Sequence, residues 1–209
     1  MGRIDRGSPM GRKVIAIVGS YRKGGTIDMA VQAILEGARE KGAETRTIYL
    51  TEKHVEFCTN CRRCTQAPGL QRGQCVQQDD LQAILDEVDT ADAIVLGSPV
   101  NYWNLTAITR RFMERLLGCV YWPWGMSSPQ PRDTQPARKA VLVASSGMPG
   151  FCIPLLTGAA RALRVTAKML GAKTVAKLWI GLVAQKPQQA LPARTLAHAR
   201  RIGLRLGRE

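Results

Sequence analysis

Four of the six cysteines are spaced closely enough to act together, in the pattern C-x2-C-x2-C-x10-C: Cys58, Cys61, Cys64 and Cys75. The tight spacing of the first three brings three thiolates onto one small face, as an iron–sulfur cluster requires, and a fourth ligand can come from farther along the chain. Arg62 and Arg63 lie inside the motif. Their charge would lower thiolate pKa values and offset the negative charge of a ligated cluster. The spacing therefore favours a [4Fe–4S] cluster.

The long segment between the third and fourth cysteines, Thr65–Gln74, leaves two alternatives open. The four thiols can be unligated in a protein that carries no cluster, or they can bind zinc. A disulfide framework does not suit a cytoplasmic chain. The remaining two cysteines, Cys119 and Cys152, have no partner at motif spacing, and we expect them to be small buried apolar residues.

The loop Gly19–Thr26 is the second segment whose residue types could bind a ligand. It supplies hydroxyl groups, two cations (Arg22 and Lys23), flexible backbone amides and the start of a helix. These are the groups that grip a phosphate. The alternative is a Gly-rich turn that serves only close packing of a strand against a helix.

Spacing excludes two familiar nucleotide motifs. A P-loop requires G-x-x-x-x-G-K-[ST], but here Gly24 is followed by Gly25 and Thr26 without the lysine. The dinucleotide fingerprint G-x-G-x-x-G is absent as well. A single phosphate on a mononucleotide fits this loop better than a triphosphate or pyrophosphate, which indicates FMN.

The elements that must position these residues alternate between strands and helices. Short apolar runs at Val14–Val18 and Ala93–Leu96 predict buried parallel strands. Three more strands are predicted at Thr45–Leu50, Ala140–Ala144 and Thr174–Ile180. The predicted helices are Thr26–Lys41, Asp79–Asp89 with Asp79 as N-cap, Leu105–Leu117, Pro154–Leu170 and Ala193–Leu206. This alternation predicts an α/β fold with a doubly wound parallel sheet covered on both faces, and a ligand site at the carboxyl ends of its strands.

Three segments together resemble a known family: Gly19–Thr26, the cysteine cluster ending in Cys75–Asp80, and Gly97–Ala107. Over roughly residues 13–180 the chain is similar to the NADPH-dependent FMN reductase and iron–sulfur flavoprotein family. The resemblance implies a flavodoxin-like, five-stranded parallel sheet in the order 2-1-3-4-5. It also implies bound FMN, NAD(P)H as co-substrate, and a homodimer or homotetramer with each flavin near a subunit boundary.

The resemblance further implies a role for each loop. The FMN phosphate would lie on the first loop, at Ser20, Arg22, Lys23, Gly25 and Thr26. The isoalloxazine ring would be wrapped by Pro99, Val100, Asn101, Tyr102, Trp103 and Asn104. The pyrimidine edge of the ring would be bordered by the segment Ser145–Gly150, through Ser145, Ser146 and Gly147.

The chain departs from the family pattern at the first loop. The family usually has Pro where this chain has Tyr21, and Asn-Thr where it has Thr26-Ile27. One phosphate-binding hydroxyl is lost, so we expect weaker FMN binding than is typical. Tyr102 and Trp103 make the second loop unusually aromatic; they would stack on the flavin or, alternatively, pack in the core.

A Pro-rich stretch, Tyr121–Ala137, is longer than most connections, and its Trp122 and Trp124 are costly to expose to water. We expect it to cover the flavin across a dimer interface, or alternatively to pack on its own subunit. Residues 1–12 are polar and basic, and we expect a disordered lead-in there. Residues 13–209 would form one domain, with a Cys-rich insertion at 58–75.

The formal net charge is +14, yet no helix-turn-helix, zinc-finger or aromatic RNA-binding signature accompanies it, so we expect no nucleic-acid partner. No apolar run is long enough to span a bilayer and no signal peptide is visible, which predicts a cytoplasmic protein without a membrane partner. Four arginines spaced for one face of the C-terminal helix form a solvated surface or a docking face for an acidic redox protein: Arg194, Arg201, Arg205 and Arg208.

With only two histidines, His54 and His198, the chain is poorly supplied for a His-based triad. This scarcity suits a flavoenzyme, in which the cofactor performs the chemistry and the protein orients it. We therefore predict an oxidoreductase that passes electrons from NAD(P)H through FMN to a quinone, a flavin or an iron–sulfur acceptor. No proton-transferring side chain is assigned. The alternative is an iron–sulfur flavoprotein that carries electrons without turning over a small molecule.

Overall fold

Five parallel strands form the central sheet of the protein, whose computed structural model describes residues 11–132, 138–185 and 189–208. They are β1 (Lys13–Val18), β2 (Glu44–Tyr49), β3 (Ala93–Asn101), β7 (Arg138–Ser145) and β8 (Ala172–Ile180). Their order is β2-β1-β3-β7-β8, which confirms the predicted order 2-1-3-4-5. The three middle strands are buried along most of their length, because helices cover both faces of the sheet, and this accounts for their continuous apolar runs.

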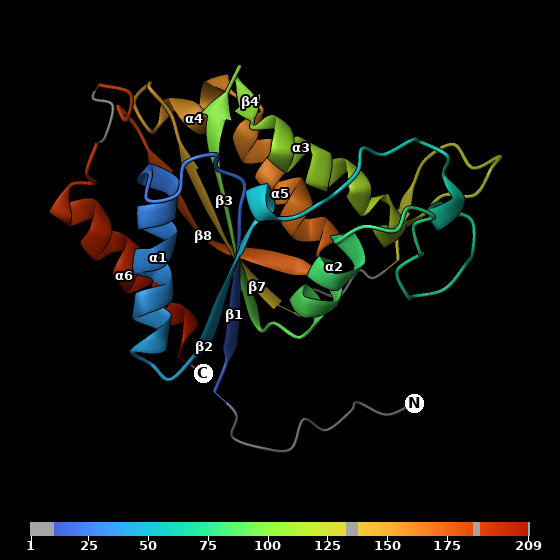
Figure 1. Ribbon diagram of the computed structural model, residues 1–209, viewed down its shortest axis with the longest axis horizontal. Helices are drawn as coiled ribbons and strands as arrows, with labels where there is room; N and C mark the ends of the chain where they lie inside the picture. Colours follow the sequence, from blue (N-terminus) through green and yellow to red (C-terminus); the bar gives the residue numbers. More distant parts are fainter. Residues whose placement is uncertain (1–10, 133–137, 186–188, 209) are drawn as a thin grey trace.

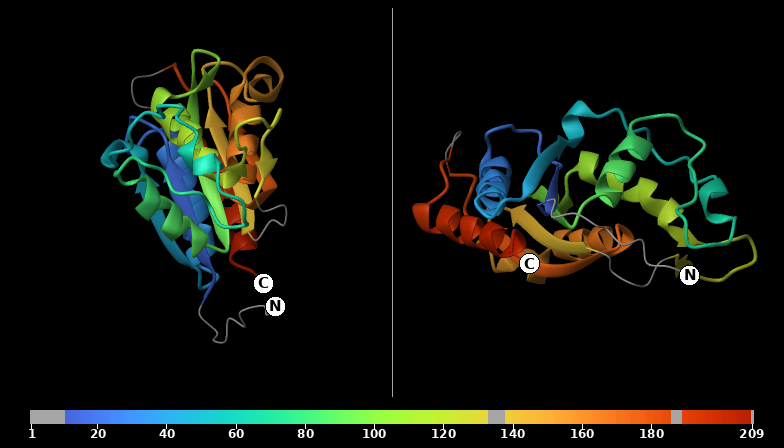
Figure 2. Two further views of the ribbon diagram at one scale, coloured as in Figure 1. Left: turned by 90° about the vertical axis from the view of Figure 1, so that its right-hand side faces the viewer. Right: turned by 90° about the horizontal axis from the view of Figure 1, so that it is seen from below.

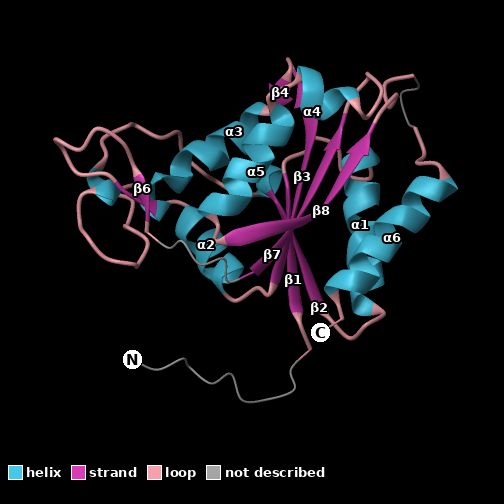
Figure 3. Ribbon diagram, turned by 180° about the vertical axis from the view of Figure 1, so that it is seen from behind, coloured by secondary structure: helices cyan, strands magenta, loops and turns pink. Residues whose placement is uncertain are grey.

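Helices cover the sheet in two layers (Figures 1 and 3). One face carries α1 (Thr26–Arg39) and α6 (Ala193–Leu206), and the other carries α2 (Leu81–Asp89), α3 (Ala107–Glu114) and α5 (Ala159–Met169). The backbones of α1 and α6 approach closely, since a Cβ on Gly203 would lie 1.8 Å from the carbonyl oxygen of Ile34. The four predicted surface arginines are exposed, three of them on α6 and Arg208 just beyond its end, whereas Ala199, Ile202 and Leu206 of α6 are buried.

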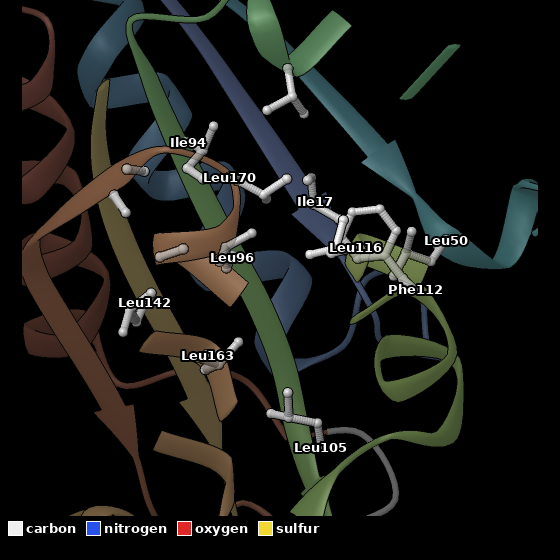
Figure 4. Packing of buried hydrophobic residues seen from close by; sticks show 14 of the residues in the cluster. Ile17, Leu50, Ile94, Leu96, Leu105, Phe112, Leu116, Leu142, Leu163 and Leu170 are labelled. Atoms are coloured by element: carbon white, nitrogen blue, oxygen red, sulfur yellow. The ribbon is translucent and has the colours of Figure 1, made fainter. Parts of the chain in front are cut away.

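The larger apolar cluster fills the space between the sheet and the α2, α3 and α5 layer. Figure 4 shows Phe112 and Leu116, from α3 and the 3-10 helix η3 (Arg115–Cys119), beside Ile17 of β1 and Leu50, the first residue of η1 (Leu50–Glu52). These side chains are at most 3% exposed. This packing fixes the α3 layer against the carboxyl ends of β1 and β2.

Two predicted helices are interrupted in the structure. The predicted helix Leu105–Leu117 begins as a short strand, β4 (Asn104–Leu105), paired antiparallel with the end of β3; α3 and η3 follow. The predicted helix Pro154–Leu170 is divided into α4 (Cys152–Leu156) and α5. Thr157 divides them, because its hydroxyl donates to the carbonyl of Ile153 (2.7 Å) and accepts from the N–H of Ala159 (3.3 Å).

The prediction that Asp79 caps α2 is wrong: the N-cap is Asp80, and the helix begins at Leu81. The Asp79 carboxylate accepts the N–H of Leu81 (3.0 Å), but it is held mainly by the buried guanidinium of Arg115. A long-range ion pair thus decides where this carboxylate lies.

The segment around the cysteines lies at the side of the sheet with little regular structure (Figures 1 and 2). It contains η2 (Arg63–Thr65) and the two-stranded β5 (Val120–Tyr121) and β6 (Gln130–Pro131). We call residues 56–79 and 115–132 the cysteine-rich lobe. Residues 1–10 of the expected lead-in and 133–137 of the Pro-rich stretch lie outside the described residues. Within the described ranges, no helix has the length and apolar character to cross a bilayer.

Candidate functional site

Three loops that follow β1, β3 and β7 gather at one edge of the sheet, the upper edge in Figure 1. We call this region the loop edge. The carboxyl ends of parallel strands meet here, and β1 is the strand at which the order of connections reverses. In open α/β sheets this is the position where ligands bind.

The first loop presents donors to an anion. The N–H groups of Thr26, Ile27 and Asp28 in the first turn of α1 have no hydrogen-bond acceptor within the part of the chain that the structure describes. Gly25, the N-cap, contributes no side-chain bond. The hydroxyl of Ser20 is 7% exposed and accepts the N–H of Arg22 at 3.2 Å. Unsatisfied amides at a helix start and an adjacent hydroxyl fit a phosphate.

Two carboxylates that the sequence analysis did not consider also reach this loop. Lys23 is ion-paired with Glu52 of η1 and lies over the ring of Tyr49, 4.6 Å from its centroid. Asp28, 7% exposed, accepts the N–H of Gly24 at 2.7 Å. The position of Asp28 directly after the loop was a sequence signal that could have been noticed, whereas the reach of Glu52 depends on how β2 packs.

The second loop is a tight hairpin between β3 and β4. Asn101 pairs with Asn104, and Tyr102 and Trp103 between them have φ values of 47° and 61°. Positive φ at both central positions is typical of a type I′ two-residue hairpin, and aromatic residues rarely adopt this conformation. Tyr102 is fully exposed and Trp103 is 60% exposed, so the core-packing alternative is wrong for both. The rings are available to a ligand or a partner.

A buried hydroxyl cluster joins the first two loops. The Thr106 hydroxyl donates to the carbonyl of Gly19 (2.6 Å) and lies 2.7 Å from the Thr109 hydroxyl, which bonds to that of Ser98 (3.1 Å). Tyr21 adds an exposed link, because its hydroxyl accepts the N–H of Ile108 at 3.2 Å. The tyrosine at the family's usual proline position therefore connects the phosphate loop to the start of α3.

The third loop is bound to the end of β8. Ser146 donates its N–H to Ile180 (2.9 Å) and its hydroxyl to the carbonyl of Met148 (3.1 Å). Ser145 and Ser146 are both at most 5% exposed. The structure thus brings the predicted residues of all three loops to the same edge and orders the two serines.

The four motif cysteines lie in the cysteine-rich lobe and not at the loop edge. Burial and then the negative charges of Cys75, Cys58 and Cys61 raise the pKa of Cys64, which indicates that the four sulfurs are neighbours. Among the described residues, no three His, Cys, Asp or Glu side chains are arranged as a ready-made metal site. The ligand role of the cysteines therefore stays a prediction.

N–H groups bond to several of these sulfurs. Cys58 Sγ accepts from Asn60 N (3.4 Å), and Cys75 Sγ accepts from Arg115 Nη2 (3.3 Å). The backbone N–H of Arg63 and the hydroxyl of Thr59 lower the pKa of the Cys61 thiol. At Cys61 these donors favour the thiolate, the form that binds metals.

Two guanidinium groups organise the lobe. Arg62 lies between two indole rings, 3.8 Å from the centroid of Trp122 and 4.2 Å from that of Trp124. Arg132, 6% exposed, donates to four carbonyl oxygens at 2.8–3.1 Å: those of Cys64, Ala67, Gly69 and Gly118. Neither has a carboxylate partner in the part of the chain described. Both tryptophans of the Pro-rich stretch therefore contact Arg62 of the cysteine motif in their own chain, while Trp124 stays 68% exposed. Arg132 folds the long segment after Cys64.

A cavity of about 440 Å³ lies away from the loop edge, where β7 and β8 begin. Its lining includes Arg72, Cys119, Arg132 and Lys168, and none of the predicted FMN residues. Burial raises the pKa of the Cys119 thiol to about 11. Cys119 and Cys152 are both half-buried, so the expectation that they are buried is wrong, although Cys119 packs against the apolar core.

The strand order and ligand edge define a flavodoxin-like α/β domain. Residues 12–182 match the model of the family described as NADPH-dependent FMN reductase, and the chain belongs to this family of FMN-dependent oxidoreductases. The resemblance found in the sequence is thus confirmed.

Curated relatives include iron–sulfur flavoproteins from Archaeoglobus fulgidus and Methanosarcina thermophila. They are 35% and 32% identical over 105 and 103 residues, which cover 50% and 49% of this chain and 46% and 51% of the relatives. The chain thus spans about half the length of the curated relatives it matches.

Solved structures show the same fold at low identity. An NAD(P)H:quinone oxidoreductase from Methanothermobacter marburgensis is 18% identical with a TM-score of 0.66, covering 94% of this chain and 99% of that one. An FMN-dependent NADH-azoreductase from Bacillus anthracis, solved in complex with FMN, is 13% identical with a TM-score of 0.68, covering 94% and 100%. An archaeal flavodoxin is 16% identical with a TM-score of 0.54, covering 93% and 96%. The flavodoxin-like fold is confirmed.

Proposed function

We propose that the protein binds FMN at the loop edge and transfers electrons from NAD(P)H to a quinone, a free flavin or an iron–sulfur acceptor. The observation that carries this proposal is the set of unsatisfied N–H groups at the start of α1, next to the buried hydroxyl of Ser20. A phosphate would satisfy these donors, and the positive end of the helix dipole favours the anion.

Each loop has a separate task in this proposal. Ser20, Arg22 and Thr26 hold the phosphate, with Lys23 and Gly25 in the same loop. The ring lies against the segment Pro99–Asn104, where Tyr102 and Trp103 exclude water from one side. Ser145, Ser146 and Gly147 border the pyrimidine edge. When bound, FMN supplies the hydride and electron chemistry, and the chain orients it.

The test is an FMN titration of flavin-free protein, followed by flavin fluorescence, together with NADH and NADPH oxidation. Arg22→Ala removes a charge-assisted hydrogen bond worth about 1.5–3 kcal/mol, so FMN affinity falls by about ten- to a hundredfold. Arg161→Ala, on the exposed face of α5, is the matched control and leaves affinity unchanged. An unchanged dissociation constant for Arg22→Ala would show that the phosphate lies elsewhere.

A second function, electron transfer through an iron–sulfur cluster, is favoured by the charges of the cysteine-rich lobe. Four thiolates around a [4Fe–4S] core leave a net negative charge, and Arg62 and Arg132 are two cations held there by carbonyls and aromatic rings alone within the described residues. Such a carrier would need no small-molecule turnover.

An iron assay on anaerobically purified protein tests this second function. Iron should be present in wild-type protein and absent from Cys61→Ser, with Cys152→Ser as the control that retains it. Absence of iron from both the wild-type protein and Cys152→Ser rejects the cluster. Near-stoichiometric zinc in the wild-type protein would indicate a structural metal site instead.

Large apolar side chains are exposed near the loop edge, and we propose that a second copy of the chain covers them in a homodimer or homotetramer. They are Tyr102, Trp103, Phe151, Leu155 and Leu156. The Trp122–Trp124 segment would then reach the flavin of the partner. We further propose one domain over residues 13–209, a cytoplasmic location, and docking of an acidic redox protein on α6. Light scattering tests the assembly, because a monomer contradicts it.

A further inference from the structure

The phosphate loop carries two cations, but two carboxylates also contact it, Glu52 through Lys23 and Asp28 through the N–H of Gly24. The ammonium of Lys23 is bound to Glu52, which is half-exposed at the end of η1. Glu52 follows β2 and is 29 residues from Lys23 in the chain. A phosphate that recruits Lys23 must therefore compete with an existing ion pair.

Asp28 is the second carboxylate, and it is buried in the first turn of α1. One of its oxygens accepts the N–H of Gly24 at 2.7 Å, and the other accepts the hydroxyl of Tyr49 at 2.8 Å. Gln32 lies within 3.4 Å of the same oxygen as Tyr49. A fixed negative charge thus occupies the helix turn whose free amides would hold the phosphate, and it uses one amide of the loop.

We propose that Asp28, assisted by Glu52, limits the affinity of the protein for FMN. This inference rests on the proposed function, in which the FMN phosphate lies on the first loop. A phosphate monoester carries close to two negative charges at neutral pH, so a carboxylate one helical turn away repels it strongly. The loop in its present form is already electrically balanced without a ligand, and bound FMN makes it strongly negative. The result is flavin that dissociates readily.

Substitution of Asp28 separates its charge from its shape. In Asp28→Asn the amide oxygen still accepts the N–H of Gly24, while the amide nitrogen donates to the oxygen of Tyr49. Glu52→Gln removes the charge that pairs with Lys23, at a more exposed position. It provides the test if Asp28→Asn does not fold. Glu40→Gln is the charge-matched control: it lies at the far end of α1, where it pairs with Arg200.

The experiment is a titration of each flavin-free full-length variant with FMN and with riboflavin, which lacks the phosphate. For FMN we expect the dissociation constant to fall by about tenfold in Asp28→Asn and about threefold in Glu52→Gln, and to stay unchanged in Glu40→Gln. Riboflavin affinity should be the same in all four proteins. The tenfold ratio between the FMN dissociation constants of the wild-type protein and Asp28→Asn should shrink toward one at about 1 M salt, because charges are then screened within a few ångströms.

Three results discriminate between the ideas. If FMN binds better than riboflavin and Arg22→Ala weakens FMN alone, but Asp28→Asn and Glu52→Gln change nothing, the inference is wrong and the proposed function stands. If Asp28→Asn tightens riboflavin as much as FMN, the charge does not act on the phosphate and the inference is again wrong. If wild-type protein binds FMN no better than riboflavin and Arg22→Ala has no effect, the proposed phosphate site itself is wrong.

Discussion

The loop edge and the cysteine-rich lobe satisfy their polar groups by different means. At the loop edge, short hydroxyl side chains on strand ends and helix starts bond to one another and to the carbonyl of Gly19, as Ser98, Thr106 and Thr109 show. In the lobe, long arginine side chains bond to carbonyl groups that no sheet ladder satisfies.

The difference follows from what each region is built on. The sheet already fixes the strand ends to one another, so the loops need only short-range links. The lobe has one short strand pair and two 3-10 helices, so its shape depends on a few side chains that cross it. We therefore expect single substitutions to affect the stability of the lobe more than that of the loop edge, while the loop edge responds mainly in ligand affinity.

The largest effect is expected from the ion pair between Asp79 and Arg115, whose side chains are each 1% exposed. Asp79→Asn leaves a buried guanidinium without a counter-ion and should lower the free energy of unfolding by about 3–5 kcal/mol. Asp80→Asn removes a neighbouring carboxylate whose single side-chain hydrogen bond, among the described residues, is accepted from the N–H of His54. This variant should lower the free energy of unfolding far less. Equal urea midpoints for the two variants would contradict this ranking.

The same ion pair gives the lobe a pH dependence. Burial acts to raise the pKa of Asp79, but hydrogen bonds from Arg115 and from the N–H groups of Glu56 and Leu81 outweigh it, so the pKa lies below its ordinary value. The stabilising contribution is therefore complete above the unfolded-state pKa of about 3.9 and is lost as the pH falls through the lower folded-state value. Unfolding of Asp79→Asn should lack this acid transition.

The next largest effect is expected in the rate at which iodoacetamide modifies two cysteines, one from each region. With a pKa of about 11, the Cys119 thiol of the lobe is about one part in a thousand thiolate at pH 8. Iodoacetamide should therefore modify Cys119 more slowly than Cys152, a half-buried cysteine at the loop edge whose exposure is similar. Peptide mapping by mass spectrometry measures both rates in one sample. The modification rate of Cys119 should rise about tenfold per pH unit. Similar rates for Cys119 and Cys152 at pH 8 would contradict this prediction.

A smaller effect is expected from the hydroxyl cluster at the loop edge. Thr106→Val removes the donor to the carbonyl of Gly19 and should lower stability by about 1–3 kcal/mol. It should also weaken FMN binding, because the carbonyl belongs to the phosphate loop. Thr90→Val, whose hydroxyl bonds at the exposed end of α2, is the matched control. Loss of stability with unchanged FMN affinity would show that the cluster does not position the loop.

The smallest effect is expected at the indole clamp of the lobe. Arg62→Lys keeps the positive charge but loses the flat guanidinium between Trp122 and Trp124, and should cost about 1 kcal/mol. The tryptophan fluorescence spectrum should shift toward that of exposed indole. Arg63→Lys alters an exposed neighbour and should leave the spectrum unchanged. Identical spectra for all three proteins would show that the clamp does not hold the rings.

The resemblance to a known family supplied the strand order, whereas the sequence by itself determined the alternation of strands and helices, the edge at which the loops meet and the close spacing of the cysteines along the chain. Each of these features follows from local signals: apolar runs such as Val14–Val18, a Gly-rich turn after a strand, and the spacing of three cysteines within seven residues. Such signals can be interpreted without the tertiary structure, because a parallel sheet brings its strand ends together whatever side chains the loops carry.

Only the tertiary structure decided which charged groups face these features. Lys23 and Glu52 are 29 residues apart, and Arg132 and Cys64 are 68 apart. Whether the first loop is cationic or balanced, and whether the long segment after Cys64 is loose or folded, depends on such pairs. A side chain reaches its partner only after the elements that carry both have packed, and no local spacing in the chain specifies that distance. The two cations of Gly19–Thr26 therefore predicted a phosphate site, which stays a prediction, but they did not predict the carboxylates of Asp28 and Glu52 beside it.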